Sequence, residues 1–236
     1  LISENKEKNL VIGNLGEIKA VAFDIDGTLY KNWQLNFRIT GHFLRHIYFF
    51  AHYGLARKDL RKISQVDDFS KVQAGFMAKR LNVTAEEAQS LLDKIIYEGL
   101  MPYFARITPC RNSLETIKSF KEAGFKIALL SDFPPEQKGE LWGFKPYCDL
   151  LLGTEACGAL KPLPDAFKAM AEKLGVKPEE ILYVGNSLKY DVMGSKNVGM
   201  KAAWFATKWD YFWKGCPKEP DFVFHNYLKL KEFVLN

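Results

Sequence analysis

The chain has 236 residues, of which 47% are hydrophobic and 26% are charged. These values are typical of a folded globular protein and argue against a disordered or low-complexity chain. The net charge of +5 is smaller than that of most nucleic-acid-binding proteins, so we expect no nucleic-acid partner.

The cysteines and the apolar segments indicate the compartment. The four cysteines are widely spaced and form no C-x-x-C pair, so we expect reduced thiols rather than disulfides or a zinc ribbon. The most apolar stretch, residues 43–50, is interrupted by Arg45 and His46 and is too short to span a membrane. Residues 1–9 are polar and unlike a secretory signal. We therefore expect a cytoplasmic protein with no membrane partner.

Short apolar runs predict the buried strands of a sheet. The first run, residues 18–23, leads directly to Asp24, and later runs are also followed by polar turns. Helical patterns separate these runs, which predicts a parallel sheet with helices on both faces. Such sheets bind ligands at the carboxyl ends of their strands. The later strands are expected at residues 126–130, 149–153, 181–184, 200–205 and 222–224, and the helices at residues 112–123, 135–142, 164–174, 189–197 and 227–234.

The segment from residue 31 to residue 106 interrupts this alternation. It has almost no strand signal, and a capping-box pattern at Thr84 and Glu87 starts the last of its amphipathic stretches. We predict an α/β protein with a core of residues 17–30 and 107–236 and an inserted helical domain of residues 31–106. The amphipathic stretches cover residues 41–53, 66–81 and 84–99.

The positive charge is concentrated in this insertion, which contains 12 Lys and Arg residues but only 7 Asp and Glu residues. A solvated basic surface would explain this excess. The alternative is an electropositive lid that attracts an anionic substrate to the site below it.

Two aspartates at the end of the first strand are the strongest chemical signal. Asp24 and Asp26 are two residues apart, so their side chains point the same way unless the chain turns. Burying two anions is costly, and Mg²⁺ with oxygen ligands would remove this cost. Gly27 permits an unusual turn directly after the pair. An ordinary Asp-Gly turn is the alternative interpretation.

Other polar residues follow the later strands. Ser131 ends the second strand, Lys161 precedes a helix, and Asp191 follows the strand of residues 181–184. A hydroxyl, an ammonium group and a third carboxylate at neighbouring strand ends, together with the acid pair, indicate a site for an anion and a metal ion.

These motifs, in this order, resemble those of the haloacid dehalogenase superfamily, whose commonest members are Mg²⁺-dependent phosphatases. The matching elements are D-x-D-G-T at residues 24–28, Ser131, Lys161, and the G-D-S-x-x-x-D-like element at residues 185–191. The resemblance covers about residues 18–206. It implies a Rossmann-like parallel sheet core with an inserted α-helical cap domain. Members with such a cap include small-molecule phosphatases, a sugar-phosphate mutase and the dehalogenases.

The resemblance also implies a role for each residue. Asp24 would be the nucleophile that becomes an aspartyl-phosphate, and Asp26 would act as general acid and then as general base. Ser131 and Lys161 would hold the phosphoryl oxygens. Thr28 and Asp132 are further candidates for phosphate binding, and the implied metal ligands are Asp24, Asp26, Asn186 and Asp191.

Asn186 departs from the family pattern, because an acid that ligates the metal usually stands at this position. Its amide oxygen is a neutral ligand, which predicts weaker Mg²⁺ binding or a larger role for Asp191 in or beside the metal site. Dehalogenases also lack this acid. However, a dehalogenase has no alkoxide to protonate and no metal to hold, so the presence of Asp26 favours phosphoryl transfer.

Two weaker signals come from basic and aromatic residues. Arg38 and Arg45 lie near one face of the first predicted cap helix and are candidates to bind a second anionic group of the substrate. A partly exposed helix would explain the same pattern. Aromatic residues at 204–205 and 209–213 predict loop packing on the core or, alternatively, a rim contact with substrate or a partner.

The sequence therefore predicts a cytoplasmic, Mg²⁺-dependent phosphatase that hydrolyses a small phosphorylated metabolite and is a monomer or homodimer. One alternative is a dehalogenase or sugar-phosphate mutase on the same scaffold. The other is a catalytically weak member that binds a ligand or a protein.

Overall fold

The computed structural model describes residues 16–207, 210 and 218–236. The core of the protein is a sheet of six parallel strands in the order β3-β2-β1-β4-β5-β6. This order confirms the predicted Rossmann-like sheet. The strands are β1 (Ala20–Asp24), β2 (Lys126–Ser131), β3 (Leu150–Gly153), β4 (Ile181–Gly185), β5 (Lys201–Phe205) and β6 (Phe222–Phe224).

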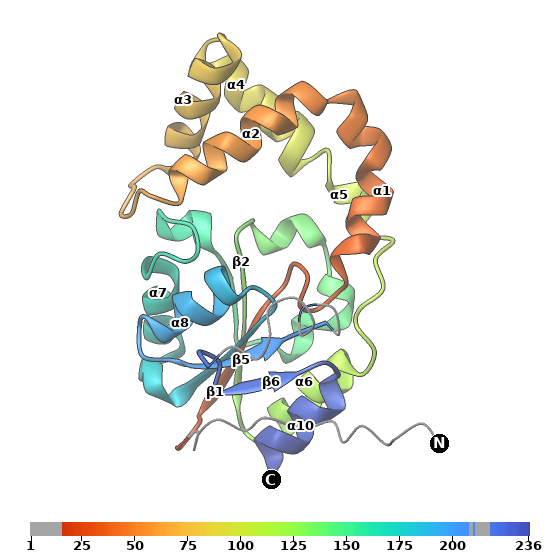
Figure 1. Ribbon diagram of the computed structural model, residues 1–236, viewed down its shortest axis with the longest axis vertical. Helices are drawn as coiled ribbons and strands as arrows, with labels where there is room; N and C mark the ends of the chain where they lie inside the picture. The colour runs from red at the N-terminus through yellow and green to blue at the C-terminus, as the bar shows by residue number, and fades with distance from the viewer. Residues whose placement is uncertain (1–15, 208–209, 211–217) are drawn as a thin grey trace.

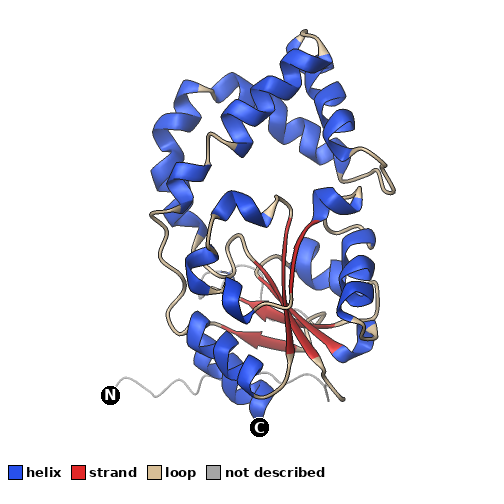
Figure 2. Cartoon of the chain, turned by 180° about the vertical axis from the view of Figure 1, so that it is seen from behind, coloured by secondary structure: helices blue, strands red, loops and turns tan. Residues whose placement is uncertain are grey.

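Helices cover both faces of the sheet (Figure 2). Val21 and Phe23 of β1 belong to the apolar cluster that includes α6 (Ser113–Glu122) and α10 (Tyr227–Leu235). Ala20 and Ala22 belong to the cluster on the other face, with α7 (Asp165–Leu174). Alternate residues of β1 thus face opposite helical layers, and every β1 residue is buried.

The sheet topology brings the polar strand ends together. β1 lies between β2 and β4, and the chain extends from β1 toward β3 on one side and toward β6 on the other. The gap between β1 and β4 is therefore the topological switch point, where open α/β sheets bind ligands. In the register of the sheet, Asp24 pairs with Leu130, so Asp24 and Ser131 lie at the same edge.

The insertion lies beyond the carboxyl ends of the strands (Figure 1). It joins β1 through α1 and returns to the core after α5, and its described residues form helices as predicted. Thr84 and Glu87 form both hydrogen bonds of the predicted capping box. The elements are α1 (Asn32–Arg45), α2 (Ile47–Leu60), α3 (Phe69–Leu81), α4 (Ala85–Leu92), the π-helical turn η1 (Asp93–Tyr97) and α5 (Met101–Phe104).

Two predicted helices differ from the structure. The pattern over residues 41–53 is divided at His46, which has non-helical backbone angles between α1 and α2. The helix expected over residues 135–142 is replaced by the 3-10 turns η2 (Pro135–Lys138) and η3 (Leu141–Gly143). Gly139, Leu141 and Trp142 have positive φ angles, which an α-helix cannot contain.

Short helical turns lie before and after β3 and β4. The helix predicted over residues 189–197 is present as a π-helical turn and a short α-helix. The elements around β3 and β4 are η4 (Lys145–Tyr147), η5 (Thr154–Cys157), η6 (Pro178–Glu180), η7 (Leu188–Val192) and α8 (Met193–Lys196).

Some sequence predictions fall outside the described residues, namely those on residues 1–9, 209 and 211–213. Trp204 and Phe205 are buried in β5, which agrees with core packing for these two aromatics.

The described cysteines, Cys110, Cys148 and Cys157, are free thiols. Among the described helices, none combines the length and the apolar character needed to cross a lipid bilayer.

Candidate active site

Asp24, Lys161 and Asp191 meet in the interior at the end of β1. The Lys161 ammonium donates to Asp24 Oδ1 at 2.5 Å and to Asp191 Oδ1 at 2.8 Å. The three side chains are 5% exposed or less. The hydroxyl of Thr28 donates to the second Asp24 oxygen, Oδ2, at 2.8 Å. Four residues that the sequence predicts for the site are therefore in direct contact.

The turn after Asp24 needs a glycine. Gly27 has φ +91°, and a Cβ atom at this position would lie 2.4 Å from Asn186 Nδ2 and 2.5 Å from Asn32 Nδ2. The Tyr227 hydroxyl donates to the backbone carbonyl of Thr28 at 2.9 Å and supports the turn from the core. This local geometry brings Asn186 against the first motif, as predicted, and adds Asn32, which sequence reasoning missed.

Asp26 points to a different set of partners from Asp24. Its Oδ1 accepts a hydrogen bond from Tyr30 Oη at 2.7 Å, and its Oδ2 accepts one from Ser131 Oγ at 2.7 Å. The Lys138 ammonium lies 3.3 Å from the same Oδ2 and 3.1 Å from Ser131 Oγ. Tyr30 and Lys138 were not predicted, because neither belongs to a recognisable motif of this sequence.

Asp191 and Asn186 lie on the loop and π-helical turn that follow β4. Asp191 Oδ2 accepts a hydrogen bond from the Ser187 backbone amide at 2.9 Å, so both oxygens of this carboxylate have donors. The Asn186 backbone carbonyl accepts one from Trp204 Nε1 at 2.9 Å. A Cβ on Gly185 would lie 2.3 Å from Asp191 Cβ, so the glycine permits this close approach.

Asp132 has a different position from the one expected of a phosphate-binding residue. Its Oδ1 accepts from Thr154 Oγ1 and from the Lys161 backbone amide, and its Oδ2 pairs with Arg61 at 2.6 Å. Burial by itself would raise the pKa of Asp132, but the nearby cations of Lys161, Arg61 and Arg57 hold this pKa below its usual value. The Asp132 carboxylate thus joins Thr154, Lys161 and Arg61, and a role of Asp132 in phosphate binding stays a prediction.

The arginines that link the insertion to the core are not the two predicted ones. Arg38 donates to a backbone carbonyl of its own helix, and Arg45 is exposed at the end of α1. Arg57 instead pairs with Glu155 and donates to the Asp132 carbonyl at 3.0 Å. Arg61 pairs with Asp132 and donates to the Lys161 carbonyl. A role of Arg38 and Arg45 in substrate binding stays a prediction.

The buried charges at the end of β1 do not balance. Burial, and next the charge of Asp191, raise the pKa of Asp24 to about 8, while Lys161 acts in the opposite direction. Burial alone would lower the pKa of Lys161, but Asp191 and Asp24 raise it well above its usual value. Two carboxylates thus share one buried ammonium ion, which leaves an excess of negative charge.

This charge and these donor atoms fit a hard divalent cation. Candidate oxygen ligands are the Asp24 carboxylate and the Asn186 amide, whose Oδ1 lies 3.5 Å from the same Thr28 hydroxyl that donates to Asp24. A cation beside Asp24 would lower the pKa of this carboxyl, as Lys161 does. Within the described part of the chain, no group of three or more His, Cys, Asp or Glu side chains could hold a metal ion. A cation at this site would therefore rely partly on backbone and amide oxygens and on water.

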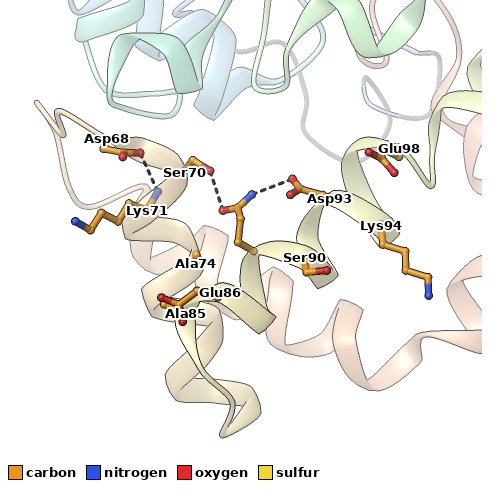
Figure 3. A pocket seen from close by; sticks show the side chains of 11 residues that line it. Asp68, Ser70, Lys71, Ala74, Ala85, Glu86, Ser90, Asp93, Lys94 and Glu98 are labelled. Carbon is orange, nitrogen blue, oxygen red and sulfur yellow. Dashed lines mark hydrogen bonds between the residues drawn. The ribbon is translucent and has the colours of Figure 1, made fainter.

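A large open depression lies elsewhere, between α3 and α4 of the insertion (Figure 3). It has a volume of about 1050 Å³ and includes no residue from the strand ends. The Gln89 amide joins Ser70 and Asp93 across it by hydrogen bonds of 2.8 and 2.9 Å. Three of its polar side chains thus satisfy one another, and we take the buried charges at the strand ends as the candidate site.

The chain is similar in sequence to named phosphatases and in fold to a named dehalogenase. The chain is 29% identical over 197 residues to pyrophosphatase PpaX of Halalkalibacterium halodurans, covering 79% of this chain and 83% of the relative. It is 30% identical over 200 residues to glyceraldehyde 3-phosphate phosphatase of Methanopyrus kandleri, covering 78% and 82%. The solved structure of 2-haloacid dehalogenase from Pseudomonas syringae pv. Tomato has the same fold, with a TM-score of 0.65 and 19% identity over 92% of this chain and 98% of the other.

A family model adds the decisive match. The haloacid dehalogenase-like hydrolase model matches residues 18–199, which include every strand-end residue described above. The motif order, the sheet topology and this match agree, and the chain belongs to the family of haloacid dehalogenase-like hydrolases.

Proposed function

We propose that this chain is a Mg²⁺-dependent phosphatase that hydrolyses a small phosphorylated metabolite through an aspartyl-phosphate on Asp24. The observation that carries the proposal is the pairing of buried Asp24 with Lys161 and Thr28, while Asp26 lies beside Ser131. The named activities of the two relatives, both on phosphorylated compounds, support the same reaction class.

In the proposed first step, an Asp24 carboxylate oxygen attacks phosphorus and the bond from phosphorus to the leaving oxygen breaks. Asp26 enters this step in its protonated form and gives its proton to that oxygen. In the second step, Asp26 takes a proton from a water molecule that attacks phosphorus, which releases phosphate and restores Asp24. Two easier displacements thereby replace one difficult displacement.

Lys161 and Ser131 would hold the phosphoryl oxygens during both steps. Lys161 supplies a fixed positive charge at the nucleophile. The Ser131 hydroxyl now donates to Asp26, so it has to turn toward the substrate when the phosphoryl group arrives. This exchange would free Asp26 to face the leaving oxygen.

A bound Mg²⁺ would offset the negative charge of the phosphoryl group and of the nearby carboxylates. The residues proposed to hold it are Asp24, Asp26 through its carbonyl, and Asn186. Asp191 would act beside the metal, because its two oxygens already accept hydrogen bonds from Lys161 and from a backbone amide.

Residues 31–106 are proposed to be a cap domain that excludes water and selects the substrate. A dehalogenase has the same fold, so the fold alone does not separate the two reactions. The presence of Asp26 favours the phosphatase, because an alkoxide leaving group needs a proton donor and a halide does not.

The test is hydrolysis of p-nitrophenyl phosphate with and without Mg²⁺, with Asp24→Asn as the blank. We expect product release that requires Mg²⁺ and is abolished in Asp24→Asn. Release of halide from chloroacetate without release of phosphate from any ester would instead establish a dehalogenase. Retained ligand binding with negligible turnover on a panel of sugar phosphates would establish a binding protein.

A further inference from the structure

Lys138 is a buried cation next to the proposed general acid. It lies at the end of η2, seven residues after Ser131, and its side chain is 0% exposed. The Lys138 ammonium forms an ion pair with the Asp26 carboxylate at 3.3 Å, and no other ion pair of Lys138 is found among the described residues. The same ammonium donates to Ser131 Oγ at 3.1 Å. Burying the Lys138 ammonium costs free energy, because the charge loses its contact with water, and a surface lysine does not bear this cost.

Aromatic rings enclose the rest of this ammonium group. Its Nζ lies 5.2 Å from the centre of the Phe104 ring and 5.6 Å from that of Phe133. Cation–π contacts of this kind stabilise a desolvated ammonium and restrict its position. Phe104 belongs to α5 of the insertion, whereas Phe133 follows β2 of the core. Lys138 is therefore held between the two parts of the chain.

The η2 and η3 turns are also anchored to the insertion, one on each side of Lys138. The Gln137 amide donates to the Ile96 carbonyl at 2.6 Å and to the Tyr97 carbonyl at 3.0 Å. The Trp142 indole donates to the Phe104 carbonyl at 2.8 Å. The position of Lys138 consequently depends on helices of the insertion.

We propose that Lys138 is a positioning residue, which holds the Asp26 carboxyl group in place through the catalytic cycle. The proposal rests on the proposed phosphatase function. Asp26 has two hydrogen-bond donors, Tyr30 and Ser131, and one ion-pair partner, Lys138. The Ser131 hydroxyl has to leave Asp26 to bind the phosphoryl group. Lys138 and Tyr30 then remain to keep Asp26 directed at the leaving oxygen, and the insertion sets this direction through Phe104.

The experiment compares two phosphate esters that differ in their need for an acid. The 4-nitrophenolate group of p-nitrophenyl phosphate leaves without a proton, whereas the alkoxide of β-glycerophosphate needs one. In Lys138→Met, we compare kcat/KM, which covers the steps up to release of the leaving group and excludes the common hydrolysis of the intermediate. We expect it to fall about 100-fold on β-glycerophosphate and less than about threefold on p-nitrophenyl phosphate. In an Asp26→Asn background, Lys138→Met should cause no further loss on either ester.

The controls separate this role from a general loss of structure. Lys145→Met removes an exposed lysine seven residues further on and should leave both rates unchanged. If Lys138→Met is not recovered folded, Lys138→Gln takes its place, since both remove the charge. Equal losses on both esters, or no loss on either, would overturn the positioning role alone. An inactive parent enzyme would overturn the proposed function and this inference with it.

Discussion

Single residues at the strand ends determine the chemistry of this site. Asp24, Ser131 and Asp191 could be placed together from the sequence, because Asp24 and Ser131 end recognisable strands, Asp191 comes shortly after another, and parallel strands end at one edge. Tyr30 and Lys138 could not, because their roles depend on contacts with Asp26 that only the folded chain creates. The same limit explains why Asp132, next to Ser131, was expected at the phosphate site but pairs with Arg61.

Asn186 offers a direct test of the metal site. Asn186→Asp adds a charged oxygen of nearly the same shape beside Gly27. We expect the Mg²⁺ concentration that gives half-maximal activity to fall about tenfold, which corresponds to about 1.4 kcal/mol. Calorimetric titration with Mg²⁺ measures the same change without turnover. Asn36→Asp is the control, since it adds the same charge on an exposed part of α1. An unchanged Mg²⁺ dependence would reject Asn186 as a ligand.

The elements differ in how strongly their own sequences determine them. α4 begins at a capping box whose two hydrogen bonds are local, so Thr84 and Glu87 predicted its start correctly. The segment of residues 135–142 has a helical pattern, yet it forms 3-10 turns. Leu141 and Trp142 have positive φ angles there, and the Trp142 indole donates to the Phe104 carbonyl, so contacts with the rest of the chain outweigh the helical preference. Tertiary contacts of this kind are invisible in the sequence.

The turn after β1 and helix α2 provide a matched pair of glycine substitutions. Gly27→Ala requires a strained φ of +91° and a contact of 2.4 Å with Asn186. We expect it to lower the free energy of unfolding by about 2 kcal/mol or more. Gly54→Ala, at an exposed position of α2 with open space around it, should raise that free energy by about 0.5–1 kcal/mol. Urea denaturation measures both, and an equal effect of the two variants would contradict the account of the turn.

Over the whole molecule, buried polar contacts join the insertion to the core. Arg57 of α2 pairs with Glu155 of η5 and donates to Gln73 of α3 at 3.1 Å. Tyr97 of η1 donates to the same Glu155 at 2.8 Å. The sequence predicted the positive charge of the insertion but not this network, because charge counts do not distinguish a buried arginine from an exposed one.

Removing Arg57 should show how much this network contributes to stability. Arg57→Met leaves Glu155 buried without its cation, and we expect a loss of about 3–5 kcal/mol in the free energy of unfolding. Lys58→Met, which changes the exposed neighbour in α2, should stay within about 0.5 kcal/mol of the parent. Guanidinium denaturation compares the two. Equal stabilities of the two variants would mean that the Arg57 network does not stabilise the docked insertion.

The most direct test of the account is to find the phosphoryl group on Asp24. Asp26→Asn should slow hydrolysis of the intermediate, because Asp26 activates the water of the second step. This variant is mixed with p-nitrophenyl phosphate and Mg²⁺, quenched with acid and digested for mass spectrometry. The account predicts one added phosphoryl group on the peptide that contains residues 24–28, at Asp24, and none in the double variant with Asp24→Asn. Product release with no phosphorylated Asp24 peptide, or with the group on another residue, would contradict it.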